Sequence, residues 1–192
     1  MKNLTIAITY HDEQNLLSRC VSSIAGQLGP EDEILVYDDA SRFSAEDYIP
    51  KESAVRVIHG EKNSGPAHGR NVLLREARGE YLHFHDADDW FSPKWAKAVR
   101  PLLDTELCDA VFTEVSSHRD GICVCEKVVG LSSLKKDSDL VRFCIRRFML
   151  VPTGTYHRKT LEAIGGYRED LWQSEDYDFH VRLANSGIRY LV

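Results

Sequence analysis

The sequence lacks features that define several classes of protein. No apolar run approaches the roughly 18 residues that a membrane-spanning helix needs, and the residues after Met1 show no signal-peptide pattern. Basic residues are also outnumbered by acidic ones, because 24 Lys and Arg stand against 30 Asp and Glu, a net charge of −6. Proteins that bind nucleic acid through bulk electrostatics are usually basic, so nucleic acid is not an expected partner.

The cysteine pattern and the absence of two nucleotide-binding motifs exclude further classes of protein. The five cysteines form an odd set at irregular spacing, which favours reduced thiols in a cytoplasmic protein. Cys123 and Cys125 could bind a metal, but no second ligand pair lies at zinc spacing. No G-x-G-x-x-G follows the first predicted strand, which disfavours a dinucleotide-dependent dehydrogenase, and Pro66-Ala67 replaces the residues that a P-loop requires.

Predicted strands and helices alternate at short intervals. Short apolar runs predict strands, and apolar residues three to four positions apart predict helices. We expect strands at 4–10, 33–37, 55–59, 81–85, 110–115, 122–129 and 188–192, an extended segment at 151–156, and helices at 16–28, 66–78, 92–103, 137–147 and 175–186. This order predicts an α/β fold with a mostly parallel sheet flanked by helices. No repeat or linker interrupts it, so we expect a single domain over residues 1–192.

Two acidic clusters follow predicted strands. Asp38 and Asp39 come after the second strand, and Asp86, Asp88 and Asp89 come after the fourth. Ligands of open α/β sheets bind outside the carboxyl ends of the strands, and clustered carboxylates favour a hard cation such as Mg²⁺ or Mn²⁺. The natural substrate is then a nucleotide diphosphate, whose charge the metal offsets. The simpler interpretation is that Asp is common in loops and helix caps, and it accounts for the first cluster equally well.

Three other features each admit two interpretations. Arg70 is either a functional residue that binds a phosphate or braces the acidic loop, or a solvated arginine on the surface of a helix. Asp176 is either a general base or an acidic residue in the first turn of a helix, where the dipole favours it. His83 and His85 resemble the start of a metallo-β-lactamase motif, but the register of the following residues fails. Packed strand histidines are therefore the preferred interpretation, and a metallohydrolase remains an alternative.

Six motifs in the correct order resemble family 2 glycosyltransferases, which have the GT-A fold. The resemblance runs from about residue 4 to residue 192. The segments that carry it are Ile8-Thr9-Tyr10-His11, Tyr37-Asp38-Asp39-Ala40-Ser41, Asn63-x-Gly65-x-Ala67-x-x-Arg70-Asn71, Gly79-Glu80-Tyr81-Leu82 with Asp86-Ala87-Asp88-Asp89, Gly165-Gly166-Tyr167 and Glu175-Asp176-Tyr177-Asp178-Phe179.

The resemblance implies a role for particular residues. Thr9, Tyr10 and Asp39 would hold the nucleotide base and ribose, and Arg70 would support the sugar-nucleotide pocket. Asp86 would face the ribose, while Asp88 with Asp89 would face Mn²⁺ or Mg²⁺ and the diphosphate. Asp176 would deprotonate the acceptor hydroxyl, because an inverting displacement needs a base on the opposite face of the sugar.

The expected enzyme is therefore an inverting glycosyltransferase that uses a nucleotide-sugar, most often a UDP-sugar in this family. Its expected acceptor is a carbohydrate or a lipid-linked glycan in surface polysaccharide synthesis. Family members usually continue beyond the last predicted strand, so we expect a truncated domain whose absent part carries acceptor contacts and peripheral membrane association at the inner face. A nucleotide-sugar-binding module without catalysis is the alternative, and the sequence leaves the oligomeric state open.

Overall fold

The computed structural model describes residues 2–105, 108–134 and 139–192. The first half alternates strands and helices as the sequence predicts, and no described helix is long and apolar enough to span a membrane. Its elements are β1 (Leu4–Tyr10), α1 (Asn15–Ala25), β2 (Glu33–Asp38), the 3₁₀ turn η1 (Ala45–Tyr48), β3 (Val55–His59), α2 (Pro66–Glu76), β4 (Tyr81–Asp86) and α3 (Trp95–Leu103).

The second half departs more from the predicted pattern. Its elements are β5 (Ala110–Phe112), β6 (Ser117–Arg119), β7 (Ile122–Cys125), η2 (Leu131–Ser133), α4 (Leu140–Arg146), η3 (Val151–Thr153), β8 (Gly154–His157), α5 (Arg158–Ala163), α6 (Glu175–Asn185) and β9 (Tyr190–Leu191). The sequence did not predict β6 or α5, and both are short. The first two residues of the predicted helix 137–147 lie outside the described part of the chain. In the described part, helix α4 starts at Leu140, after the N-cap Asp139.

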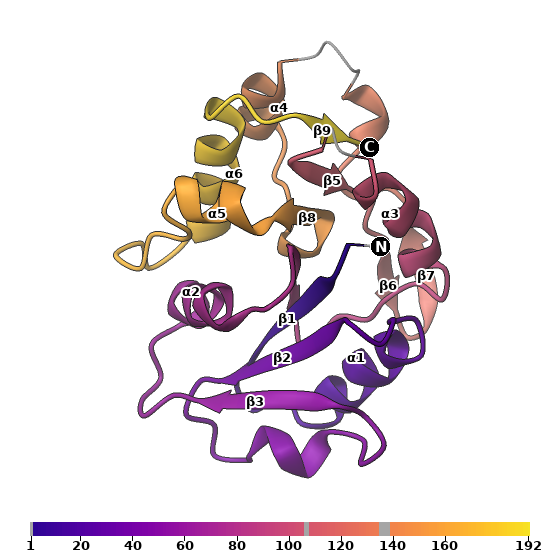
Figure 1. Cartoon of the computed structure of the whole chain (residues 1–192), viewed down its shortest axis with the longest axis vertical. Helices are drawn as coiled ribbons and strands as arrows, with labels where there is room; N and C mark the ends of the chain where they lie inside the picture. The colour runs from indigo at the N-terminus through magenta and orange to yellow at the C-terminus, as the bar shows by residue number, and fades with distance from the viewer. Residues whose placement is uncertain (1, 106–107, 135–138) are drawn as a thin grey trace.

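Seven strands form one sheet in the order β3-β2-β1-β4-β8-β5-β9 (Figure 1). The strands β1 to β4 are parallel, while β8 runs antiparallel to both of its neighbours. The prediction of a mostly parallel sheet is therefore confirmed, with one reversed strand. The predicted strand 122–129 is shorter, and it pairs with β6 in a separate hairpin rather than joining the main sheet.

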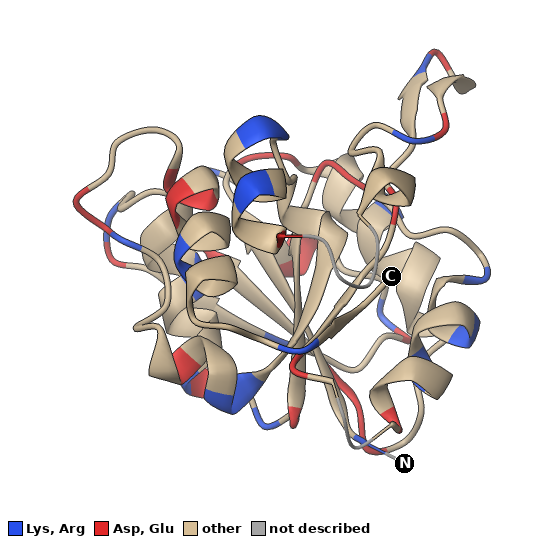
Figure 2. Cartoon of the chain, turned by 90° about the horizontal axis from the view of Figure 1, so that it is seen from above, with Lys and Arg blue, Asp and Glu red and all other residues tan. Residues whose placement is uncertain are grey.

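Helices cover both faces of the sheet (Figure 1). Alternate residues of β4 point to opposite faces, because side chains in a strand alternate. Leu82 and Phe84 contribute to a core under α2, α4, α5 and α6, whereas Tyr81 belongs to a second core under α1 and α3. Charged residues lie mainly on the outer helices and loops (Figure 2). The five cysteines are free, with Cys123 and Cys125 exposed.

The parallel strands bring distant segments to one edge. In the register of the sheet, Tyr10 lies beside Asp38, and Thr9 lies beside Asp86. The carboxyl ends of β1, β2 and β4 therefore meet, as parallel strands from successive βα units must. Both acidic clusters of the sequence follow strands that end at this edge.

Candidate functional site

A cavity of about 360 Å³ opens at this edge of the sheet. Its walls come from the ends of β1, β2 and β4 and from the loop and first turns of α2. Six of the predicted site residues line it, namely Thr9, Tyr10, Asp39, Arg70, Asp86 and Asp88. The structure therefore brings together residues that lie up to 79 positions apart, judged from Thr9 and Asp88. Asp89 and Asp176 are not among its lining residues.

Arg70 is the charged centre of the cavity wall. Its side chain is 4% exposed, and its guanidinium donates to Asp86 at 2.9 Å and to Glu175 at 2.8 Å. Burial alone lowers the pKa of Arg70, but Asp86 and the other hydrogen-bonded groups outweigh burial and raise it. The guanidinium is therefore a permanent positive charge, and it joins the end of β4 to the start of α6.

Asp39 organises the loop that precedes α2. One carboxylate oxygen accepts from the Ser64 amide and the other from the Gly65 amide, both at 2.8 Å. His11 holds the same loop from the side of β1, because its ring bonds the Asp39 carbonyl and the side-chain amide of Asn63. The loop is thus fixed as one wall of the cavity before any ligand binds.

Asp38 has a structural role and is only 2% exposed. Its two oxygens accept from the backbone amides of Ser41 and Ala45 at 2.9 and 3.0 Å. Of the two neighbouring aspartates, Asp39 alone lines the cavity, while Asp38 shapes the turn that follows β2.

The polar side chains at the end of β1 already form hydrogen bonds within the protein. The Tyr10 hydroxyl donates to the Phe43 carbonyl at 2.8 Å, and burial raises the pKa of Tyr10 to about 12. Thr9 donates to Asp86 at 3.1 Å. The Tyr10 hydroxyl therefore already has a partner within the protein.

Asp88 is the exposed carboxylate of the cavity. It forms no side-chain hydrogen bond or ion pair with any residue in the described part of the chain, although its carbonyl accepts from Arg19. Asp89 lines a neighbouring cavity instead, and burial, followed by Asp88 and Asp86, raises its pKa to about 6. Neither carboxylate forms an ion pair with a described residue, and Arg19 is the one cation that lowers the pKa of Asp89, so the pair fits a divalent cation.

The aspartates after β4 do not form a complete metal cage. Among the described residues, Asp86, Asp88 and Asp89 do not bring three ligand atoms within 4.8 Å of one another. Mg²⁺ usually takes only one or two carboxylates and completes its shell with substrate phosphates and water. The residues present therefore fit a cation held between Asp88 and a diphosphate, and Asp89 stays a predicted ligand.

Asp176 lies in the first turn of α6, next to Glu175. It is half-buried, and burial raises the pKa of its carboxyl. One of its oxygens accepts from the Tyr177 amide at 2.8 Å. The ion pair between Arg70 and Glu175 holds this end of α6 against the cavity of about 360 Å³, so Asp176 lies near that cavity without lining it.

Two residues of this region are not predicted as site residues by the sequence. The sequence presents Glu175 as an acid of the first helical turn and as part of the motif Glu175–Phe179, without a role of its own, yet it pairs with buried Arg70. Asn71 donates to the Tyr167 carbonyl and accepts from the Tyr167 amide, at 2.9 and 2.8 Å. The adjacent Glu175-Asp176 pair was the available signal for Glu175, whereas nothing local in the sequence indicated the partner of Asn71.

His83 and His85 are buried strand histidines, as the preferred interpretation predicted. The Nε2 of His83 lies 3.3 Å from the Nδ1 of His85, and its Nδ1 lies 3.1 Å from Thr155. The ring of His85 stacks on Phe91 with centroids 3.9 Å apart. No set of three possible metal ligands in the described ranges includes either histidine, so the geometry gives the metallohydrolase alternative no support.

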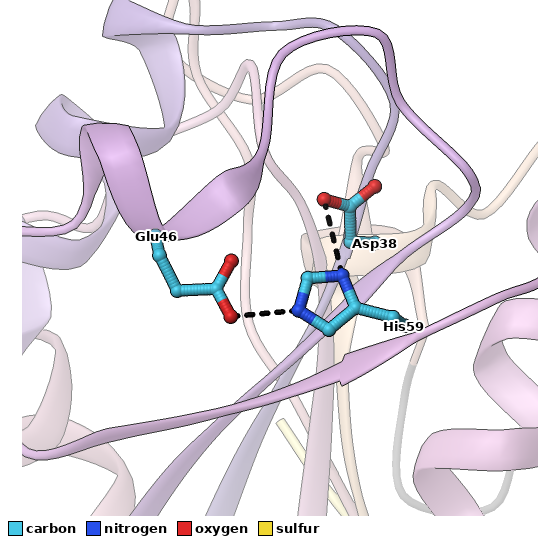
Figure 3. A group of neighbouring side chains, drawn as sticks. All are labelled: Asp38, Glu46 and His59. Atoms are coloured by element: carbon cyan, nitrogen blue, oxygen red, sulfur yellow. Dashed lines mark hydrogen bonds and ion pairs between the residues drawn. The ribbon is translucent and has the colours of Figure 1, made fainter.

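A second group of possible ligands, Asp38, Glu46 and His59, lies where η1 meets the ends of β2 and β3 (Figure 3). The two carboxylates contact different nitrogens of the His59 ring, at 3.7 Å for Asp38 and 2.7 Å for Glu46. The ring therefore lies between the carboxylates, as Figure 3 shows. Asp38 is already committed to two backbone amides, so this arrangement serves to hold η1 against β3.

Comparison with known proteins extends the resemblance. The chain is 28% identical to the poly(ribitol-phosphate) beta-N-acetylglucosaminyltransferase TarS of Staphylococcus aureus over 201 residues, which cover 100% of this chain and 34% of TarS. It is 29% identical to the uncharacterized glycosyltransferase YwdF of Bacillus subtilis over 196 residues, covering 94% of this chain and 68% of YwdF. A teichoic acid poly(glycerol phosphate) polymerase of Staphylococcus epidermidis is 31% identical over 94 residues, covering 46% of this chain and 13% of the polymerase.

Solved structures share the fold. A crystal structure of S. aureus TarS 1-349 in complex with UDP-GlcNAc superposes with a TM-score of 0.74 at 24% identity, covering 96% of this chain and 53% of that one. The mannosyltransferase PcManGT of Pyrobaculum calidifontis, in complex with GDP-Man and Mn²⁺, gives a TM-score of 0.73 at 21% identity, covering 100% and 54%. The chain thus spans about half of these structures, and the expected GT-A fold is confirmed.

The family is established by a longer match than any single motif. The model of Glycosyl transferase family 2 matches residues 5–165, which include both acidic clusters and the loop before α2. That match agrees with the order of the six motifs and with the sheet topology. The chain therefore belongs to Glycosyl transferase family 2.

Proposed function

We propose that this chain transfers a sugar from a nucleotide-diphosphate donor, a UDP-sugar, to an acceptor hydroxyl with inversion at the anomeric carbon. The observation that carries the proposal is the cavity at the carboxyl ends of β1, β2 and β4, which joins Asp39, Arg70 and Asp88. Family membership and the crystal structures of S. aureus TarS in complex with UDP and with UDP-GlcNAc support this class of donor.

The donor contacts two parts of the cavity, one near β1 and β2 and the other near β4. Near β1 and β2, Thr9, Tyr10 and Asp39 hold the base and ribose. Near β4, Asp86 faces the ribose, and Arg70 places a buried positive charge beside the diphosphate. Because Arg70 is fixed by two carboxylates, little side-chain freedom is lost when the donor binds.

Asp88, with Asp89 beside it, would hold Mn²⁺ or Mg²⁺ against the diphosphate. A cation bound there stabilises the negative charge that develops on the leaving group. The PcManGT complex with GDP-Man and Mn²⁺ supports the use of a divalent metal, and the choice between Mn²⁺ and Mg²⁺ is part of the proposal.

Asp176 is the proposed general base. An inverting displacement requires the acceptor oxygen to attack the face of the sugar opposite the leaving diphosphate, so the base must come from a separate element. Asp176 meets this condition because it belongs to α6, which Arg70 links to the end of β4 through Glu175 and Asp86. A raised pKa makes its ionised carboxylate a stronger proton acceptor.

The acceptor is a carbohydrate or lipid-linked glycan in surface polysaccharide synthesis. The names of TarS and of the teichoic acid polymerase refer to polymers, which supports a polymeric acceptor, although the polymers named there are polyol phosphates. We place the reaction in the cytoplasm, at the inner face of the membrane where a lipid-linked acceptor would be presented.

Release of UDP from UDP-GlcNAc and UDP-glucose, with Mn²⁺ and with EDTA, tests the function. We expect Mn²⁺-dependent release that Asp176→Asn lowers at least about a hundredfold, the usual size of a general-base effect, while calorimetric UDP binding is retained. Glu162→Gln, an exposed change on α5, is the control. Unchanged rates in Asp88→Ala and Asp176→Asn would refute the assigned roles, and UDP binding without turnover would favour the non-catalytic module.

A further inference from the structure

Trp172 is the most exposed large hydrophobic side chain in the described part of the chain, with 97% of its surface accessible. No hydrogen bond or ring contact joins its indole to another described residue. Exposing an indole forgoes the large burial free energy that an aromatic ring normally contributes to folding. The fold therefore does not explain why a tryptophan stands at this position.

The segment that carries Trp172 is fastened at both ends. On one side, Asn71 bonds Tyr167 and also donates to Glu169 at 2.7 Å. On the other side, Arg70 bonds Glu175 at 2.8 Å. The indole is thus presented outward by a segment whose two ends are both held by the middle of α2.

Residues of this segment line another cavity, of about 270 Å³. Trp172 and Glu175 line it on one side, and Asn63, Gly65 and Pro66 line it on the other. The last three residues also line the donor cavity, so the two cavities share a wall. A molecule in contact with Trp172 would therefore lie beside the donor, and Trp172 precedes Asp176 by four residues.

The charge around Trp172 restricts the class of molecule that could bind there. Residues 168–176 contain four carboxylates and one guanidinium. Asp170 pairs with Arg168 and Glu175 pairs with Arg70, which leaves Glu169 and Asp176 as the carboxylates without an arginine partner. These two carboxylates disfavour phosphate groups, whereas a neutral sugar ring presents C–H groups to an indole face and hydroxyls to neighbouring carboxylates. A sugar ring suits this surface better than a polyol phosphate chain.

We propose that Trp172 binds a neutral sugar ring of the acceptor by stacking, and that it thereby presents the acceptor hydroxyl beside Asp176. The inference rests on the proposed function and makes it more specific. It predicts a glycan acceptor rather than the polyol phosphate polymers that the names of TarS and the teichoic acid polymerase indicate for those relatives.

The test compares the wild type with Trp172→Ala in calorimetric titrations with maltotriose, chitotriose and poly(glycerol phosphate), each with UDP and Mn²⁺ present. We expect at least one of the neutral oligosaccharides to bind the wild type, and Trp172→Ala to weaken that binding about tenfold, the size of one aromatic contact. UDP affinity should stay within about twofold, because Trp172 does not line the donor cavity. Phe148→Ala, which removes another exposed aromatic ring, is the matched control.

Each other outcome overturns a distinct statement. Equal oligosaccharide binding by the wild type and Trp172→Ala, or no oligosaccharide binding by either protein, overturns the stacking role. Binding of poly(glycerol phosphate) that depends on Trp172 overturns the neutral acceptor, and loss of UDP affinity in Trp172→Ala assigns the residue to the donor instead. A wild-type chain that binds no UDP with Mn²⁺ refutes the proposed function itself.

Discussion

Arg70 and Glu175 lie 105 residues apart in the sequence, yet the Nη1 of Arg70 donates to the Oε1 of Glu175 at 2.8 Å. The other terminal nitrogen of the same guanidinium holds Asp86 at 2.9 Å. One buried cation therefore fixes both the end of β4 and the start of α6. This relationship places Asp176 next to the donor cavity.

Replacement of Arg70 by alanine should strongly destabilise the fold. The change leaves Asp86 and Glu175 without their shared counter-charge, and breaking a buried ion pair from one side costs about 3 kcal/mol. The free energy of unfolding, measured by urea denaturation, should fall by that amount. Arg168→Ala removes an exposed arginine that pairs with Asp170 and should change little. Equal losses in the two variants would contradict the bridging role of Arg70.

Gly166 should tolerate alanine worse than its neighbour Gly165. Both have positive φ, at 66° and 77°, so alanine carries a similar backbone cost at each position. A Cβ on Gly166 would lie 2.4 Å from the Asn71 Oδ1, whereas nothing lies within 4 Å of one on Gly165. We expect Gly166→Ala to lower the free energy of unfolding by roughly 1–3 kcal/mol more than Gly165→Ala. Similar midpoints of urea unfolding would show that Asn71 moves away freely.

Stability should fall in mild acid because of His180. Burial lowers the pKa of this residue from 6.5 to about 4, and its ring bonds Tyr156 and the Asp176 carbonyl. The unfolded chain therefore takes up the proton first as pH falls. The contribution of His180 is fully present above about pH 6.5 and is lost progressively toward pH 4, by about 3 kcal/mol.

The His180→Gln variant checks this pH dependence. Its free energy of unfolding should decline less between pH 7 and pH 4 than that of the wild type, although His83 and His85, whose pKa values burial also lowers, keep part of the slope. His118→Gln, at an exposed position on β6, serves as the reference. Parallel curves for His180→Gln and the wild type would exclude the assignment.

Asp88→Asn should uncouple metal binding from nucleotide binding. Asp88 is exposed and lies near Asp86 and Asp89, so removal of its charge should leave the melting temperature unchanged or slightly raised. Calorimetry should show that Mn²⁺ strengthens UDP binding in the wild type but not in Asp88→Asn. The matched control is Asp120→Asn, an exposed change in the β6–β7 turn. Full Mn²⁺ dependence in Asp88→Asn would place the cation elsewhere.

Local pattern was enough to predict the first half of the fold. The apolar runs at β1, β2, β3 and β4 matched the strands closely, because buried parallel strands leave a continuous apolar signal. The pattern failed where elements are short or exposed. The strand β6 is wholly exposed, and α5 has six residues, too few for a clear helical period.

The sequence alone was enough to predict the family, the α/β class and the positions of the acidic clusters, because each prediction depends on the order of residues along the chain. Only the tertiary structure decided which acids share a cavity. In the structure, Asp38 accepts hydrogen bonds from backbone amides, Asp89 lines a neighbouring cavity, and Arg70 pairs with Glu175. These outcomes depend on the order of strands in the sheet and on side-chain direction at its edge, and neither is a property of neighbouring residues in the chain.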